Sequence, residues 1–287
     1  MVIDAKTKLY GLLAHPCQHS MSPLMHNTAF AHHQLNSTYL AFDVLPENIE
    51  AALAGMRAMG VAGVNLSMPL KTAVLPYLDD IEPAAKLIGA VNTIKNDHGR
   101  LTGYNTDGLG LLQALAPEFE PKGAQIAILG AGGAAKSVAV HCALAGVKKI
   151  TIFNRHIGPG SRADALQQLL ATGTEAEVEV YALDNTAQLK QTLGQVALLV
   201  NATNLGMGTY EGQSPLPTPA VFSKDIIVFD MIYAPRETAL LKSARAAGLT
   251  RVHNGIGMLI QQGAAAFKIW TGEEMPISLV KEKLELN

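Results

Sequence analysis

A glycine-rich loop in the middle of the chain constrains the fold most. Residues 125–129, QIAIL, form an apolar run of strand length that leads directly into GAGGAA at 130–135. A helical segment over 134–145 and a second apolar run at 149–153 follow. A glycine loop that ends a strand and opens a helix lets a pyrophosphate lie against the main chain and the helix N-terminus. The pattern predicts a βαβ unit that binds a dinucleotide, the alternative being an ordinary turn rich in small residues.

Strand-length apolar segments alternate with segments of helical period along the whole chain, which favours α/β units around mostly parallel sheets. The length of 287 residues makes two domains likelier than one. We expect a hairpin at Asp97–Gly99 and a helix that starts with Ser22 at its N-cap. Strands are expected at 9–14, 39–42, 63–66, 92–96, 101–104, 125–129, 149–153, 178–181, 198–201 and 227–230, and helices at 47–59, 83–88, 134–145, 161–171, 186–193, 238–247, 257–271 and 276–286.

Composition excludes several classes of protein. Lys and Arg number 22 against 24 Asp and Glu, which gives a net charge of −2 and no basic surface for a nucleic acid or an anionic membrane. A hydrophobic content of 48% with 16% charged residues excludes a disordered chain. The two cysteines, Cys17 and Cys142, and the absence of a signal-like N-terminus predict a cytoplasmic protein. The uncharged stretch 252–267 contains His, Asn and Gln and falls short of a membrane span.

The end of the strand after the glycine loop bears on the choice of cofactor. An Asp or Glu about 20 residues beyond the loop would accept the ribose 2′-hydroxyl of NAD. The chain has Asn154-Arg155-His156 there instead, and Arg155 could pair with a 2′-phosphate. NADP is therefore favoured. Arg162 is a second candidate beyond Gly158-Pro159-Gly160, and the alternative for both arginines is a solvated surface.

Three further features, all within the first 107 residues, could bind a substrate or take part in a reaction. Ser20 and Ser22 stand at the expected helix start, where hydroxyls and free amides can hold a carboxylate. Lys71 could act as an acid/base if burial or charge tunes it, and Asp107 could orient its ammonium group. Each has a plain structural alternative as a cap, a solvated lysine or a turn residue. Nine histidines form no spacing typical of zinc, and we expect no metal.

Taken together, the motifs resemble the shikimate dehydrogenase family, including its quinate/shikimate branch, over essentially the whole chain. Nine blocks occur in the order of the family: HSMSPLMHN (19–27), NLSMPLK (65–71), GAVNT (89–93), GYNTDG (103–108), LGAGGAAK (129–136), NR (154–155), NAT (201–203), DMIY (230–233) and NGIGMLIQQGAAAF (254–267).

The resemblance implies an enzyme of two domains. Residues 1–107 with 255–287 would form an α/β substrate-binding domain, and residues 108–254 a Rossmann-type doubly wound dinucleotide-binding domain. The implied reaction is the reversible NADP-dependent reduction of 3-dehydroshikimate to shikimate, in aromatic amino-acid biosynthesis. The partners would be a small-molecule substrate and no nucleic acid or membrane, with a homodimer as one possible assembly.

The resemblance also assigns roles by position. Lys71 would be the catalytic acid/base, paired with Asp107. The substrate carboxylate would lie at Ser20 and Ser22, with Tyr233 near that end. The remaining substrate contacts would come from Asn65, Ser67, Asn92, Asp107 and Gln262. The cofactor would be held by Gly130, Ala131, Gly132, Gly133 and Ala134 at its pyrophosphate, by Asn154 and Arg155 at the adenosine ribose, and by Met231, Gly255 and Met258 at the nicotinamide.

Departures from the family pattern keep alternatives open. Ser67 stands where biosynthetic members commonly have Thr, and the SMP and PAAKLIGAVNT sequences look more like the quinate/shikimate branch. After Asn154-Arg155 neither the usual Thr nor the Asp of NAD-using relatives is present, so NAD or dual use is an alternative to NADP. A methylenetetrahydrofolate dehydrogenase would lack the HSMSP and NTDG blocks. A non-catalytic nucleotide-binding regulator is the alternative from another class, although both Lys71 and Asp107 are present.

Overall fold

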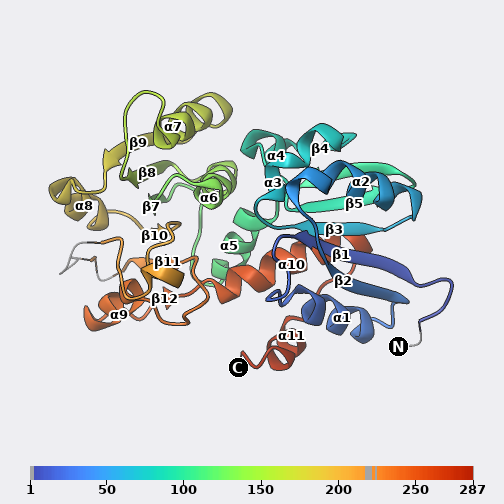
Figure 1. The fold of residues 1–287 in the computed structure, drawn as a ribbon. Coiled ribbons are helices and arrows are strands. Elements are labelled where there is room, and N and C mark those ends of the chain that lie inside the picture. Colours follow the sequence, from blue (N-terminus) through green and yellow to red (C-terminus); the bar gives the residue numbers. More distant parts are fainter. Residues whose placement is uncertain (1–2, 217–221, 224, 287) are drawn as a thin grey trace. The chain divides into compact units, whose positions relative to one another are not determined.

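The computed structural model describes residues 3–216, 222–223 and 225–286. The chain divides into two compact units, the first formed by Met1–Thr106 with Ile260–Asn287 and the second by Asp107–Leu259. Each unit has its own six-stranded sheet (Figure 1). No helix among the described residues is long and apolar enough to cross a membrane.

The first unit has a mixed sheet with the strand order β2-β1-β3-β5-β6-β4. β1 runs parallel to β2 and β3, whereas β5 is antiparallel to both β3 and β6. The expected hairpin joins β5 to β6, with positive φ angles of 51° at His98 and 92° at Gly99, as a tight two-residue turn requires. The strands are β1 (Lys8–Ala14), β2 (Ser37–Asp43), β3 (Gly63–Leu66), β4 (Asp80–Ile81), β5 (Thr93–Asp97) and β6 (Arg100–Tyr104).

Helices and short 3-10 turns complete the first unit, which has two apolar cores. One core packs Leu53 and Met56 against Val64, Ile94 and Leu101 of the sheet. The second is aromatic and is described below. The elements are α1 (Ser22–His32), η1 (Pro46–Asn48), α2 (Ile49–Ala58), α3 (Leu70–Ala73), η2 (Leu75–Tyr77), α4 (Pro83–Ile88), α11 (Ile277–Lys283) and the part of α10 (Ile256–Thr271) that begins at Ile260.

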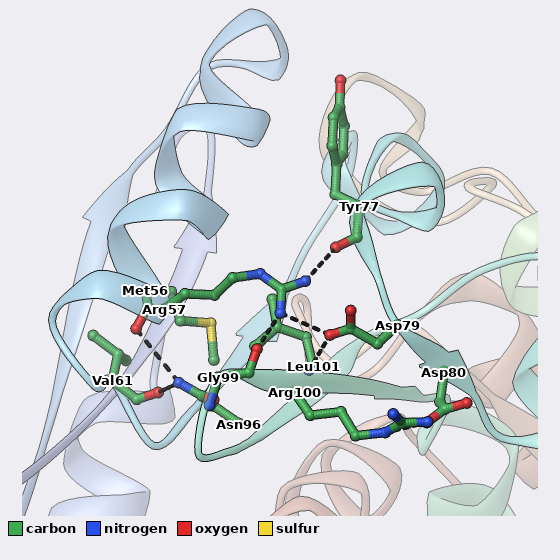
Figure 2. A network of polar contacts seen from close by, with 10 residues as sticks. All are labelled: Met56, Arg57, Val61, Tyr77, Asp79, Asp80, Asn96, Gly99, Arg100 and Leu101. Carbon is green, nitrogen blue, oxygen red and sulfur yellow. Dashed lines mark hydrogen bonds and ion pairs between the residues drawn. The ribbon is translucent and has the colours of Figure 1, made fainter.

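Arg57, on α2, binds three residues from two other segments of the first unit, the stretch around 77–79 and the β5–β6 turn (Figure 2). Its guanidinium donates to the Asp79 carboxylate at 2.7 Å, to the Tyr77 carbonyl at 3.0 Å and to the Gly99 carbonyl. Asp79 also accepts the Leu101 N–H at 2.6 Å. The hydrogen bond from Arg57, followed by that from Leu101, lowers the pKa of Asp79 below its usual value. The fork geometry of arginine thus connects α2 to the turn of the β5–β6 hairpin and to the segment that contains Tyr77 and Asp79, a connection that the sequence did not reveal.

The second unit has a fully parallel sheet with the strand order β12-β11-β10-β7-β8-β9. The chain runs outward from β7 through β8 and β9, then returns to β10 on the other side of β7. This is the doubly wound arrangement, with its switch point between β7 and β10, and it confirms the predicted fold class. The strands are β7 (Gln125–Leu129), β8 (Lys149–Asn154), β9 (Glu177–Ala182), β10 (Leu198–Asn201), β11 (Ile227–Asp230) and β12 (Val252–His253).

Helices cover both faces of this parallel sheet. On one face, Leu189 and Leu240 pack with Ala127, Leu129 and Phe153. Because side chains alternate along a strand, the intervening isoleucines of β7 and β8 point to the opposite face, where α6 contacts both strands. The helices are α5 (Asp107–Leu115), α6 (Gly133–Leu144), α7 (Arg162–Gly173), α8 (Thr186–Leu193) and α9 (Ala239–Ala246), with η3 (Gly208–Tyr210).

Local details correct three expectations. Ser22 is the first residue of α1 rather than its N-cap, which is Met21. The single helix predicted over 47–59 is a 3-10 turn followed by α2. Helix α5 was not predicted, because its sequence DGLGLL has two glycines within the first turn. Gly108 is needed there, since a Cβ atom would lie 2.4 Å from the Ser137 carbonyl oxygen of α6.

A buried histidine lies in the aromatic core of the first unit. His26 is fully buried, its ring stacks on Tyr39 with centroids 4.5 Å apart, and Trp270 is 5.2 Å away. Neither ring nitrogen has a hydrogen-bond partner. Burial lowers the pKa of His26 from 6.5 to about 3, and the nearby Asn65 amide opposes this shift only in part. The ring is therefore a neutral member of an apolar layer.

We expect acid to destabilise the protein through His26. The unfolded chain binds a proton near pH 6.5, whereas the folded chain does so only near a pKa of about 3. The stabilisation is thus complete above the unfolded pKa and is lost as the pH falls toward the folded value, at about 1.4 kcal/mol per pH unit. Urea titrations between about pH 6 and 4 measure the free energy of unfolding in the range between the two pKa values. His26→Phe should reduce the fall in this free energy with pH, because the variant lacks the group that is protonated only in the unfolded chain.

His98→Asn is the matched control, because the His98 side chain is 99% exposed and Asn tolerates its positive φ. This variant should retain the slope of the original protein. An identical slope for His26→Phe would show that acid acts elsewhere.

Candidate active site

A cluster of buried amides lies in the first unit, between strands of its sheet. The Asn65 amide donates to the Thr93 hydroxyl at 3.0 Å and accepts from the Tyr39 hydroxyl at 2.9 Å. The Asn92 amide donates to the Thr106 hydroxyl at 2.9 Å and accepts the Thr106 N–H, also at 2.9 Å. Both asparagines are buried, at 6% and 2% exposure. Because every buried amide group needs a partner, this network fixes the orientation of both side chains.

Gln262 joins this cluster from α10, since its side-chain oxygen lies 3.5 Å from the Asn92 amide nitrogen. Three residues predicted to bind substrate, far apart in the sequence, therefore meet in one place. Burial raises the pKa of Tyr39 in the same network, so its phenol remains a neutral donor. Uncharged amides and hydroxyls of this kind are suited to the hydroxyl groups of a polyol or sugar-like ring.

Lys71 and Ser67 lie beside the amide cluster. The carbonyl oxygen of Lys71 accepts the N–H of Val91 at 2.8 Å, directly before Asn92. Lys71 is half-buried in α3, and Ser67 is exposed after the end of β3, where its N–H donates to the Leu13 carbonyl. The structure thus brings the predicted acid/base residue to the segment that carries Asn92.

The two predicted carboxylate-binding serines lie at the start of α1. The Ser20 hydroxyl accepts the Ser22 N–H at 3.2 Å, and both side chains are half-buried. Ser22 also lies near the Tyr39 phenol, whose pKa it lowers slightly against the larger effect of burial. Hydroxyls and first-turn amides of α1 therefore form a polar group close to the amide cluster through Tyr39.

Asp107 and Tyr233 belong to the second unit. Asp107 is the first residue of α5 and is half-buried, and it directly follows Thr106, which is bonded to Asn92. Tyr233 is 43% exposed on the loop after β11. The pairing of Asp107 with Lys71 and the substrate role of Tyr233 remain predictions.

The glycine loop follows β7 at the switch point of the second unit. Gly130 has a φ of 100°, which glycine adopts readily, and its N–H donates to the Phe153 carbonyl of β8 at 2.8 Å. Gly132 precedes α6 as its N-cap, so the first-turn amides of a 12-residue helix point out from the loop. Ala131 is buried, whereas Gly133 and Ala134 are exposed. This is the arrangement that binds a pyrophosphate.

Gly132 has no structural requirement to be glycine. Its φ of −81° and ψ of −175° are open to any residue, and a Cβ atom there would meet no other atom within 4 Å. Gly255 contrasts with it, because a Cβ atom would lie 2.1 Å from the Met231 carbonyl oxygen. The protein's own packing thus explains Gly255, while the space above Gly132 suits close approach of a ligand to the main chain.

A cleft of about 270 Å³ lies in the second unit after β10 and β11. It brings Ala134 of the glycine loop together with Met231 and Tyr233, and the other lining residues are mostly apolar. Met258 is buried and does not line it, and Gly255 supports the wall through a 3.0 Å hydrogen bond to the Ile232 carbonyl. The full lining is Ala134, Ala202, Thr203, Met207, Met231, Ile232, Tyr233 and Ala234.

The predicted ribose-binding residues lie at the end of β8. The Asn154 amide donates to the His156 carbonyl at 2.8 Å, which shapes the turn that follows. Arg155 is exposed, and so is Arg162, the first residue of α7. No carboxylate stands at this strand end, so the residues present fit a phosphate better than a bare ribose.

Comparison with known proteins identifies the relationship. A family model for the shikimate dehydrogenase substrate binding domain matches residues 12–94, and one for the shikimate 5′-dehydrogenase C-terminal domain matches residues 255–285. The chain is 45% identical over 290 residues to the shikimate dehydrogenase (NADP(+)) of Alkaliphilus metalliredigens, covering 97% of this chain and 96% of that one. The chain belongs to the shikimate dehydrogenase family.

Solved structures agree with membership of the shikimate dehydrogenase family. Shikimate 5-dehydrogenase of Listeria monocytogenes, in complex with shikimate and NAD, is 41% identical with a TM-score of 0.94 over 98% of both chains. The ligand-free 5-ketofructose reductase of a Gluconobacter strain is 36% identical with a TM-score of 0.88, covering 98% of this chain and 99% of the other. The resemblance seen in the nine sequence blocks is thus confirmed at the level of the whole fold.

Sequence reasoning missed several residues of this shikimate dehydrogenase fold. Tyr39 and Thr106 hold the amide cluster, and Thr203 and Ile232 line the cleft. Thr106, Thr203 and Ile232 lie within the GYNTDG, NAT and DMIY blocks, but the residue type alone indicates no role, and Tyr39 lies outside every block. A buried tyrosine predicted on a strand was the one available signal, because its hydroxyl requires a partner.

We expect Gly132→Ala to weaken NADP binding without destabilising the fold. Because the added methyl group meets no protein atom, the free energy of unfolding should change by less than about 0.5 kcal/mol. The same methyl group should obstruct a pyrophosphate and weaken NADP binding at least about tenfold, measured by titration calorimetry.

Gly255→Ala should instead destabilise the fold by about 1–3 kcal/mol, since it forces the Met231 backbone to move. Unchanged NADP affinity in Gly132→Ala would remove the glycine loop from the cofactor site.

Proposed function

We propose that this chain is an NADP-dependent shikimate dehydrogenase that reversibly reduces 3-dehydroshikimate to shikimate. The observation that carries the proposal is the gathering of Asn65, Asn92, Gln262 and Lys71 in one unit of a chain whose other unit has the dinucleotide fold. The relative from Alkaliphilus metalliredigens bears this activity in its name and aligns over nearly the full length. Such an enzyme serves the biosynthesis of aromatic amino acids.

The first unit offers a site for an anionic, polyhydroxylated ring. The Ser20 and Ser22 hydroxyls and the first-turn amides of α1 would hold the carboxylate without a cationic side chain. The amides of Asn65 and Asn92, with Gln262, would bind ring hydroxyls. Ser67, exposed beside them, would add a hydroxyl, and Tyr233 would be a further substrate contact near the carboxylate end.

Lys71 would perform the proton transfer. NADPH, when bound, would supply the hydride for the carbonyl carbon, and the negative charge would then develop on the carbonyl oxygen. The Lys71 ammonium stabilises this charge and donates a proton to the oxygen, and in the reverse direction its neutral amine accepts the hydroxyl proton. Asp107 would orient the ammonium group, which requires only a charge-assisted hydrogen bond.

The second unit would bind the cofactor along the edge of its sheet. Residues Gly130 to Ala134 and the start of α6 would hold the pyrophosphate, Asn154 and Arg155 the adenosine ribose and its 2′-phosphate, and Met231, Gly255 and Met258 the nicotinamide side. NAD is a second candidate for the cofactor. It is favoured by the Listeria monocytogenes structure with shikimate and NAD and by the glycines that follow Arg155. For the substrate, the alternative is an enzyme that acts on quinate as well as shikimate.

The proposal extends to organisation and location. Residues 1–107 with 255–287 would bind the substrate, and 108–254 the cofactor. Free Cys17 and Cys142, the latter with its pKa raised by burial to about 12, suit a reducing cytoplasm. A homodimer is the proposed assembly. It could form through β2, an edge strand whose backbone can pair with a second chain and whose Leu40 is 48% exposed. Sedimentation equilibrium would test it.

Replacing Lys71 by Ala should remove most turnover and little binding. General acid–base catalysis contributes about 10²–10⁴-fold, so kcat with shikimate should fall by that range. The affinity for NADP should stay within about twofold, because Lys71 lies outside the cofactor residues. Lys86→Ala, an exposed lysine of α4 in the same unit, is the control. A kcat near that of the control would refute the acid/base role.

Initial rates with shikimate and quinate, each with NADP and NAD, test substrate and cofactor together. Arg155→Ala should raise the KM for NADP about 10–100-fold, since a charged hydrogen bond contributes about 1.5–3 kcal/mol, and leave the KM for NAD nearly unchanged. Arg162→Ala should have a smaller effect, because it lies beyond the turn. Equal kcat/KM for both cofactors in the unaltered enzyme would refute a dedicated phosphate site.

A further inference from the structure

A buried carboxylate lies directly behind the wall of the cleft in the second unit. Asp230 is the last residue of β11, with 0% of its surface exposed. Of the acidic side chains that the structure describes, it alone is buried. It begins the DMIY block. A buried charge is costly, and an apolar residue of similar volume would often stabilise a core as well. The presence of a carboxylate at this position therefore indicates a role other than core packing.

Asp230 accepts three hydrogen bonds from three different segments. Its Oδ1 accepts the Asn201 amide at 3.0 Å and the Ile232 N–H at 3.1 Å, and its Oδ2 accepts the Thr238 hydroxyl at 2.6 Å. Burial raises the pKa of this carboxyl group, and the three bonds oppose that shift, with Thr238 contributing most. An aspartate is needed to accept all three, because an asparagine would present a donor at one of the two oxygen positions.

Two of the three partners lead into the cleft. The Asn201 side-chain oxygen accepts both the N–H and the hydroxyl of Thr203, at 3.0 and 2.7 Å, and Thr203 lines the cleft. Ile232 lines it directly. From the other side, Gly255 donates its N–H to the Ile232 carbonyl at 3.0 Å. Asp230 thus connects the loops that follow β10 and β11 and fixes the backbone on either side of Met231.

The position of the cleft indicates which part of a dinucleotide it faces. A dinucleotide lies across the switch point of a doubly wound sheet. Asn154 and Arg155 follow β8 on one side of β7, whereas the cleft follows β10 and β11 on the other side. If the adenosine ribose lies at β8, the nicotinamide lies at the cleft. The lining is mostly apolar, as suits the uncharged dihydronicotinamide ring of NADPH, which must transfer hydride in the absence of water.

We propose that Asp230 is a positioning residue for the nicotinamide end of the cofactor, acting through Ile232 and through Asn201 and Thr203. The inference rests on the proposed function, because it takes the second unit to bind NADP. It assigns no proton transfer to Asp230, which lies behind the wall and not in the cleft. Its loss should therefore misplace the nicotinamide while leaving the adenosine half bound.

Two substitutions test this role. Asp230→Asn keeps the shape and replaces one acceptor by a donor, and Thr238→Val removes one hydroxyl donor. Both should lower kcat, by about 10–100-fold for Asp230→Asn, since small misplacements of reacting groups have effects of that order. Affinity for adenosine 2′,5′-bisphosphate, which lacks the nicotinamide, should stay within about twofold. The fluorescence enhancement of NADPH on binding should fall, because it reports the nicotinamide environment.

Matched variants separate positioning from stability. Thr192→Val removes a buried threonine hydroxyl of α8 in the same unit and should lose stability without losing kcat. Thr238→Ser keeps the hydroxyl and should restore the kcat that Thr238→Val loses. If Asp230→Asn does not fold, this pair still decides the question. Unchanged kcat in Thr238→Val, or equal loss of affinity for NADPH and for adenosine 2′,5′-bisphosphate, would overturn the inference.

Failure of the proposed function gives a different result. If the unaltered protein oxidises neither shikimate nor quinate but binds NADPH, the substrate assignment is wrong. The role of Asp230 can then still be tested by binding. The Asp230 and Thr238 variants should lose NADPH fluorescence enhancement but keep their affinity for adenosine 2′,5′-bisphosphate.

Discussion

The pairing of β7 with both β8 and β10 is the constraint on which the second unit depends. Because β7 is central, the chain after it must proceed to one side and later return to the other, and the two loops that leave β7 and β10 diverge. That divergence leaves room at the carboxyl ends of the strands. The glycine loop occupies one side of this space and the cleft the other. A dinucleotide site is thus a consequence of strand order before any side chain contributes.

The regular elements of this chain were largely predictable from local sequence. Strands β3, β7, β10 and β11 and helices α4 and α8 have the predicted bounds, because each is an apolar or periodic run closed by a turn residue or a cap. Helix α5 was missed, since Gly108 in its first turn is required by contact with α6 and opposes helix propensity. Short α3, β4 and β12 were also missed, because too few residues establish a period.

The candidate site was predictable only where a residue type carries chemistry by itself. Lys71, the paired asparagines and the glycine loop stand out in the sequence because of their type and motif. The residues that hold them do not, because a Tyr39 or a Thr106 is indistinguishable from other strand or loop residues until the partner is known. The two units use different solutions for buried polarity. The first pairs neutral amides and hydroxyls, whereas the second places one carboxylate, Asp230, at the centre of three donors.

The first unit is discontinuous in the chain, since residues 107–259 stand between its two parts. Its final segment supplies Phe267 and Trp270 to the aromatic layer, and the Trp270 indole donates to the Ile94 carbonyl at 2.9 Å. During synthesis the ribosome therefore releases the whole of the second unit before the first can close its core. A nascent chain would carry the open β1–β3 face for the time that more than half of the protein takes to emerge. The order of synthesis thus delays completion of the first unit's core until after the whole second unit has been made.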